Sequence, residues 1–145
     1  MLHREIKIGH LLRFSYLWHW QNRVGREDGD KIRPCLVLAL VETSERGKHT
    51  VRVLPVTHTP PLDPEHAVEI PRAVKLRLQL DNERSWIVLT ESNRFVWPGQ
   101  DLRSPPQQSA DGYLGMLPPD LFNKVKQGFV ALARSARHKS VFRSE

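Results

Sequence analysis

Residues 35–57, CLVLALVETSERGKHTVRVLPVT, decide the fold of this chain. The first seven, Cys35–Val41, form an apolar run of strand length, and His49–Thr57 alternates between apolar and polar positions as a half-buried strand does. The segment between them, residues 44–48, is polar and contains a glycine, which is typical of a turn. The sequence therefore predicts a β-hairpin at the centre of the fold.

Shorter elements surround this hairpin. Strands are expected at residues 9–18, 67–70 and 85–90, and Pro71 is expected to begin a helical turn. Glycines, prolines and charges predict loops at residues 19–32, 58–64 and 93–112.

An amphipathic helix follows Pro118, Pro119 and Asp120, which mark a helix start. The apolar residues after that start recur at helical spacing: Phe122, Val125, Phe129 and Leu132. Several short strands followed by one such helix predict a mainly β fold with α, a small β-barrel closed by a C-terminal amphipathic helix. We expect one domain over residues 1–135 and a flexible basic tail over residues 136–145.

Composition narrows the class of protein. The chain has 145 residues, of which 39% are hydrophobic and 26% charged, as in an ordinary soluble domain. Cys35 is the only cysteine, so an internal disulfide or a cysteine-rich zinc site is excluded. The longest apolar run is too short to cross a membrane, and residues 1–5 lead into no secretory signal. We therefore expect a cytoplasmic protein without a membrane partner.

The positive charge is concentrated near the C-terminus. The formal net charge is +6, yet residues 1–120 hold sixteen Lys/Arg and fifteen Asp/Glu, a difference of only +1. Residues 121–144 hold six basic residues and no acid. Such a surface attracts RNA or an acidic protein segment, although a solvated helix face and tail would have the same composition.

The order of several short motifs resembles the MazF/PemK toxin family. A first strand opens at Gly9, and a charged loop ends in Lys31-Ile32-Arg33-Pro34. The next motif is a strand that ends in Pro55-Val56-Thr57. A later strand ends at the acidic residue Glu91, and the final helix is entered through Leu117-Pro118. The resemblance runs from Gly9 to about Ala133. It implies an SH3-like barrel that forms a homodimer. It also implies a sequence-specific, metal-independent endoribonuclease, the toxin of a type II toxin–antitoxin system, restrained by an antitoxin whose acidic tail fills the RNA groove.

Two features depart from the family. The loop after the first strand is longer here and carries Trp18, His19 and Trp20, and Leu89 stands where some members have an arginine.

The resemblance directs attention to four catalytic candidates. Arg33 is expected to stabilise the charge on the phosphorane, because a guanidinium grips phosphate at two points and stays charged. Thr57 would donate its hydroxyl to the same phosphate, and His58 would act as general acid or base. Glu91 would be the general base or would orient Arg33 through a salt bridge. The alternatives are a surface arginine, a threonine in a local turn, an exposed histidine, and a structural ion pair or loop cap at Glu91.

A further set of residues is expected to bind single-stranded RNA by stacking, ion pairing or reading a base edge. We expect one ring among Trp18, Trp20, Phe95 and Trp97 to contact RNA, while the others lie in the core or a dimer interface. The other candidates are Arg23, Arg26, Asn93 and Arg94, of which Asn93 would equally close a turn.

Other chemistries find no support in the sequence. His58, Asp63, Glu65 and His66 lack a recognised metal-ligand spacing, and no glycine-rich phosphate loop is present, so neither a metal nor a cofactor is expected. Two alternatives to a nuclease remain open: a non-catalytic barrel that binds RNA or protein, and a toxin that inhibits DNA gyrase.

Overall fold

The predicted hairpin forms the centre of the protein. The structure, a computed structural model, describes residues 6–26, 29, 32–45, 47–97 and 113–143. Strands β2 (Ile32–Glu42) and β3 (His49–Thr57) pair antiparallel, with Leu36 opposite Leu54 and Val37 opposite Val53. The two strands expose alternate residues to opposite sides of the sheet, so the hairpin contributes to a core on each side.

The remaining elements are short. They are β1 (His10–Ser15), α1 (His19–Arg23), the 3₁₀ turn η1 (Pro64–His66), β4 (Ala67–Glu69), α2 (Arg72–Arg77), β5 (Trp86–Val88), β6 (Glu91–Trp97), β7 (Tyr113–Met116), α3 (Pro119–Arg134) and β8 (Lys139–Arg143).

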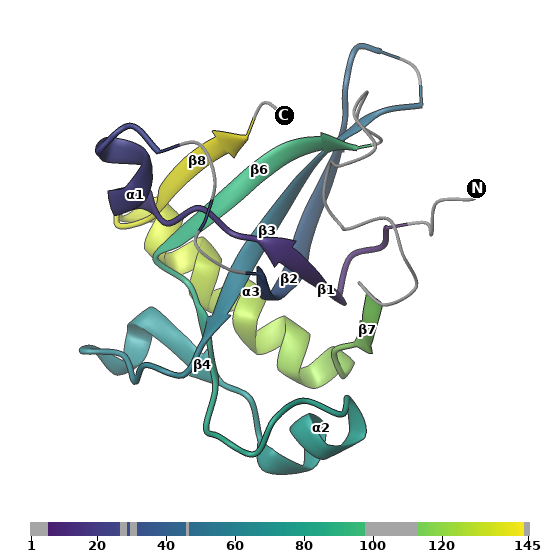
Figure 1. Cartoon of the computed structure of the whole chain (residues 1–145), viewed down its shortest axis with the longest axis vertical. Coiled ribbons are helices and arrows are strands. Elements are labelled where there is room, and N and C mark those ends of the chain that lie inside the picture. Colours follow the sequence, from purple (N-terminus) through teal and green to yellow (C-terminus); the bar gives the residue numbers. More distant parts are fainter. Residues whose placement is uncertain (1–5, 27–28, 30–31, 46, 98–112, 144–145) are drawn as a thin grey trace.

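All eight strands described belong to one sheet, with the order β4-β5-β3-β2-β1-β7 and with β6 and β8 branching from β3. Strand β3 pairs with β6 through its first residues and with β5 through Val56 and Thr57. Because one strand serves two neighbours on the same side, the sheet curls into an open half-barrel (Figure 1). All its pairings are antiparallel except that of β6 with β8. The prediction of a mainly β fold with a C-terminal amphipathic helix is confirmed.

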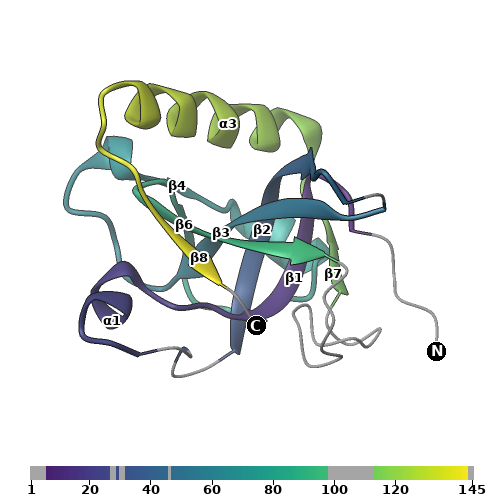
Figure 2. The same cartoon turned by 90° about the horizontal axis from the view of Figure 1, so that it is seen from above.

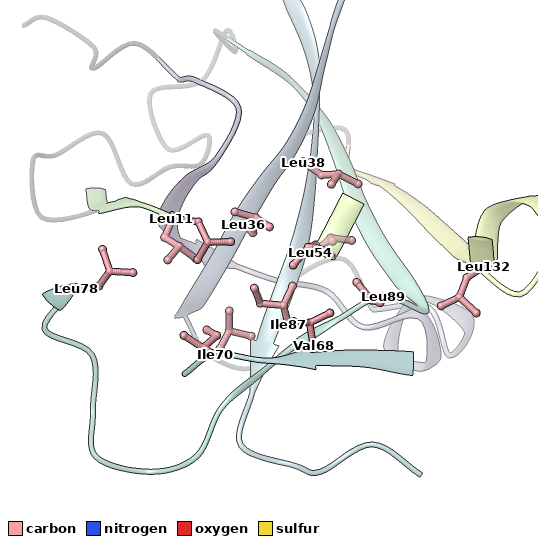
Figure 3. Close-up of a cluster of buried hydrophobic side chains, with 13 residues drawn as sticks. Leu11, Leu36, Leu38, Leu54, Val68, Ile70, Leu78, Ile87, Leu89 and Leu132 are labelled. Atoms are coloured by element: carbon pink, nitrogen blue, oxygen red, sulfur yellow. The ribbon is translucent and has the colours of Figure 1, made fainter. Parts of the chain in front are cut away.

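Helix α3 lies along one side of this sheet (Figure 2). Its buried residues Val125 and Leu132 join a cluster in which the side chains of Leu36, Leu54 and Ile87 meet at the centre (Figure 3). The helix approaches closely, since a Cβ added at Gly128 would lie 2.6 Å from a methyl carbon of Leu89.

A second core fills the other side of the sheet and is rich in aromatic rings. Phe14 and Phe95 stack there with their ring centroids 4.9 Å apart, and Trp97 is 9% exposed in the same cluster. Cys35 is fully buried among them, and this burial raises the pKa of its thiol. A thiol held in this way is a structural residue, not a nucleophile.

Three predictions about secondary structure are wrong. Residues 19–23 form α1 within the predicted loop, and residues 93–97 belong to β6, where alternate side chains are buried. The tail expected to be flexible contains β8, because Val141 is buried against the sheet and β8 pairs in parallel with β6. Residues 98–112 of the third predicted loop lie outside the described residues. No helix within the described ranges is both long and apolar enough to span a membrane.

Candidate functional site

An open cavity of about 480 Å³ lies where β2, β3 and the segment after β1 meet. Six residues line it: Trp18, Arg33, Thr57, His58, Thr59 and Val88. Arg33 is the second residue of β2 and Thr57 is the last residue of β3, and antiparallel pairing brings these two strand ends together. Three of the four predicted catalytic residues and one predicted aromatic residue therefore lie in one cavity.

Arg33 is held on two sides and open on the third. Its Nη1 atom donates a hydrogen bond to the Val56 carbonyl at 3.2 Å, and its guanidinium carbon lies 5.0 Å from the centroid of the Trp18 ring. Its Nε atom is buried with no hydrogen-bond partner among the described residues. A buried donor without an acceptor is costly, so this nitrogen is a local weakness in the packing of the arginine.

Thr57 and His58 project from the end of β3. The Thr57 hydroxyl accepts a hydrogen bond from the Thr59 backbone amide at 3.2 Å, which leaves its own proton available for donation into the cavity. The His58 Nε2 atom lies 2.7 Å from Asp81 Oδ2. Since a carboxylate beside an imidazole fixes its orientation, Asp81 positions His58 at the cavity mouth.

Asp81 is in turn fixed by Lys75, a lysine from α2 that is only 5% exposed. The Lys75 Nζ atom donates to Asp81 Oδ1 at 2.6 Å, to Ser85 Oγ at 2.7 Å and to the Glu83 carbonyl. The hydrogen bond from Lys75, followed by that from His58, holds the pKa of Asp81 below its ordinary value. The carboxylate therefore stays ionised and available to an imidazolium.

Sequence reasoning missed Asp81 and Lys75. They lie 23 and 17 residues beyond His58 in a region read only as a helical turn, and no spacing rule joins a histidine to an aspartate over that distance. The one sequence signal was Lys75 itself, a cation between Val74 and Leu76 in a short helix with a buried side.

Glu91 lies outside the cavity lining. Its Oε1 atom accepts hydrogen bonds from the Tyr16 hydroxyl at 3.1 Å and from the His19 backbone amide at 2.8 Å. The expected salt bridge to Arg33 does not form, because this carboxylate is turned towards the segment that enters α1. Burial raises the pKa of Glu91, and it also raises that of Tyr16. Glu91 thus anchors the segment that carries Trp18.

Asn93 does not reach the surface. Its side chain is 0% exposed, and its amide accepts from the Leu17 amide and donates to the Leu17 carbonyl, both at 2.8 Å. Arg143 adds a hydrogen bond to the same Oδ1 atom at 3.2 Å. The expectation that Asn93 reads an RNA base is therefore wrong, and so is its assignment to a turn.

The other predicted RNA-binding residues are scattered. Trp20 is 58% exposed on α1, with Arg23 exposed at the end of that helix and Arg26 half-buried just after it. Trp97 and Phe95 lie in the second core, as the alternative interpretation held, so neither ring is exposed for stacking with a base. Arg94 lies on the side of β6 opposite to Phe95 and Trp97, beside Phe142, and is absent from the cavity lining.

One group of side chains within the described ranges has the spacing of a metal site: His58, Asp81 and Glu83, whose ligand atoms lie within 4.8 Å of one another. All three are exposed, and the Lys75 ammonium already neutralises Asp81. A cation would have to compete with this internal positive charge, so the donor set fits an imidazole–carboxylate pair better than a metal centre.

Comparison with known proteins adds no family to these observations. No protein-family model matches the chain, and no curated protein matches it.

Proposed function

We propose that this protein is a metal-independent endoribonuclease of the MazF/PemK type, the toxin of a cytoplasmic toxin–antitoxin pair, on an SH3-like barrel. The observation that carries the proposal is the grouping of Arg33, Thr57, His58 and Trp18 around one open cavity. Cleavage of RNA without a metal needs a proton-transfer group, a cation beside the phosphorus and a donor for its oxygens. These residue types supply all three.

The proposed reaction begins when the 2′-oxygen of a ribose attacks the adjacent phosphorus while its proton passes to His58. The bond from phosphorus to the 5′-oxygen breaks, and the imidazolium, held by Asp81 at 2.7 Å, returns a proton to that oxygen. The products are a 2′,3′-cyclic phosphate and a 5′-hydroxyl. Arg33 and Thr57 donate to the phosphorane oxygens, which carry most charge in the transition state. Trp18 stacks with a base next to the scissile bond.

The first test is cleavage of a long single-stranded RNA by purified protein in EDTA, with the ends mapped. Wild-type protein is expected to cut at discrete sites and leave 5′-hydroxyl ends. Arg33→Ala is expected to slow cleavage by about 100-fold or more, as loss of one transition-state donor does elsewhere. Arg13→Ala is the matched control, because Arg13 is exposed on β1 and is absent from the cavity lining.

Thr57→Ala and Asp81→Asn separate the two halves of the site. Thr57→Ala is expected to lower the rate constant without moving the pH–rate profile. Asp81→Asn is expected to lower the rate constant by loosening the orientation of His58, because the imidazole loses the carboxylate that lies 2.7 Å from its Nε2 atom. A folded wild-type protein that leaves RNA intact, or variants that all cut at the wild-type rate, would refute the assignment.

A second candidate function is a non-catalytic RNA-binding barrel. The resemblance would place catalytic groups at positions 89 and 91. Glu91 is instead hydrogen-bonded to Tyr16 and His19, and position 89 holds a leucine that is 2% exposed, so both observations favour this second function. Tight binding of single-stranded RNA without cleavage after long incubation would select this function. The resemblance further implies a homodimer and an acidic antitoxin, which sedimentation and co-expression with a neighbouring acidic reading frame would test.

A further inference from the structure

A pair of arginines lies on the side of the sheet that α3 covers, near β8 and apart from the cavity. Arg52 on β3 is the register partner of Arg94 on β6, and Arg94 is the register partner of Phe142 on β8. Register partners project from the same side of a sheet, so these three side chains form one row across three strands. We call them the outer row.

The two guanidinium groups of the outer row are neighbours. Arg52 Nη1 donates to Ser140 Oγ at 3.3 Å, and Arg94 Nε donates to the same oxygen at 2.8 Å. Arg52 Nη1 also donates to Ser92 Oγ at 2.6 Å. Proximity to Arg94 adds to burial in lowering the pKa of Arg52. Two like charges are thus held together through neutral hydroxyl groups.

No carboxylate of the described residues lies within 4.0 Å of either guanidinium, although Arg84 and Lys48 have such partners. Each arginine has five N–H donors, of which Arg52 and Arg94 use few on the protein. Unneutralised, adjacent guanidinium groups with spare donors match the charge and the two-point geometry of a phosphate.

The hydrogen bonds behind the pair fix its position. His138 Nδ1 lies 2.7 Å from the Leu89 carbonyl, which can only accept, so this nitrogen carries the proton. His138 Nε2 then accepts from the Ser92 hydroxyl at 2.8 Å, and the Ser92 oxygen accepts from Arg52. The ring of Phe129 covers Arg52 at 5.6 Å from its centroid. The arginine is therefore preorganised for a ligand.

Phe142 supplies an aromatic surface beside the charges. It is 48% exposed on the edge strand β8, and the guanidinium carbon of Arg94 lies 5.5 Å from its ring centroid. A large exposed ring next to spare phosphate donors is the combination used to hold single-stranded nucleic acid, where bases stack while the backbone is neutralised. An acidic protein segment would use the arginines but has no base for the ring.

We propose that Arg52 and Arg94 bind a backbone phosphate of single-stranded RNA and that Phe142 stacks with an adjoining base. Arg52 and Thr57 are five residues apart on β3, roughly 16 Å along an extended strand, and an odd separation places them on opposite sides of it. The outer row is therefore a binding subsite separate from the cavity. It would hold RNA whether or not the cavity cleaves it.

The test uses a fluorescent oligonucleotide with 2′-O-methyl groups throughout, which lacks the nucleophile needed for cleavage. Binding is followed by anisotropy over a range of salt concentrations. Phe142→Ala is expected to weaken binding by about tenfold, within the range of loss per stacked base. The double variant Arg52→Gln/Arg94→Gln is expected to weaken binding by at least as much and to reduce the slope of log affinity against log salt by about 0.7, the value for one phosphate contact on a single strand.

The matched control is Arg84→Gln, which removes an exposed arginine already paired with Glu69 at 2.8 Å and should leave binding unchanged. Urea unfolding checks that each variant is folded. Since Arg52 ties strands together, Arg94→Gln and Phe142→Ala as single changes decide the matter if the double variant does not fold.

Two added titrations distinguish the source of the anion. In the first titration, inorganic phosphate is added and the amide signals of the outer row are followed. If phosphate shifts these signals in the wild type but not in the double variant, and RNA affinity is unchanged in every variant, the ligand is a small phosphate and not RNA. The second titration uses poly-glutamate. If the variants bind RNA as tightly as the wild type but bind poly-glutamate more weakly, the ligand is an acidic protein segment and not RNA. RNA affinity that is unchanged in every variant overturns the proposal. Oligonucleotide binding that depends on the outer row supports it, even if the protein proves unable to cleave RNA.

Discussion

The buried amide of Asn93 offers the sharpest test of how this fold is held together. Asn93→Ala removes both hydrogen bonds to the Leu17 backbone, and Leu17 is only 1% exposed. Each buried backbone group left without a partner costs about 1–3 kcal/mol, so with two such groups the variant should lose about 2–6 kcal/mol of unfolding free energy. For a domain of this size, that loss lowers the melting temperature by about 10 °C or more.

Urea unfolding followed by circular dichroism at 25 °C measures this change directly, and thermal unfolding gives an independent value. Asn22→Ala is the control, because Asn22 is exposed on α1 and its loss should change stability by less than about 0.5 kcal/mol. RNA cleavage per folded molecule should stay at the wild-type value for both. An Asn93→Ala protein as stable as wild type, but with weakened RNA binding, would refute this reasoning and restore the role predicted from the sequence.

Three further changes examine other contacts. Glu91→Gln should be more stable than wild type above pH 4.5, the ordinary carboxyl pKa, and the difference should vanish below it. The reason is that the Glu91 carboxyl of the folded protein has a raised pKa and retains a proton that the unfolded chain releases, so the wild type loses stability as pH rises. Urea titrations at several pH values measure this difference. Gly128→Ala should cost about 1 kcal/mol, since crowding of the buried Leu89 outweighs a gain of about 1 kcal/mol in helix propensity, and a more stable variant would show that Leu89 moves freely. Val141→Ala should lower the unfolding free energy by about 2 kcal/mol, whereas Phe142→Ala should change it by less than about 0.5 kcal/mol. Equal losses of stability in the two variants would show that Val141 does not hold β8 against the sheet.

Local pattern was sufficient to predict the elements with the clearest period. Strand β2 is an unbroken apolar run, β3 carries apolar residues at a spacing of two and helix α3 at spacings of three to four, and all three formed where expected. Strand β6 was missed because Asn93 and Arg94 are polar and the residues that satisfy them, Leu17 and Ser140, are far away in sequence. Strand β8 was missed for a similar reason, since a five-residue segment with two basic residues and a serine forms a strand only when β6 lies beside it.

The candidate site was predictable only in part. Arg33, Thr57 and His58 flank the central hairpin, so strand pairing alone brings them together. Asp81 reaches His58 through a turn that is fixed by the buried Lys75, and no rule of spacing contains that contact. Glu91 was expected in the cavity, but its hydrogen bonds to Tyr16 and His19 depend on how the chain turns into α1.

The parallel pairing of β8 with β6 also bears on how the protein is made. Arg143 donates to the Ser15 carbonyl, so a contact across 128 positions of the chain ties the first strand to the eighth. Domains that fold during synthesis do so from the N-terminus onward, but this sheet lacks its edge until residue 143 has left the ribosome. The outer row lacks Phe142 until the same moment. A nascent chain therefore cannot assemble this surface until β8 has been synthesised and has emerged to pair with β6.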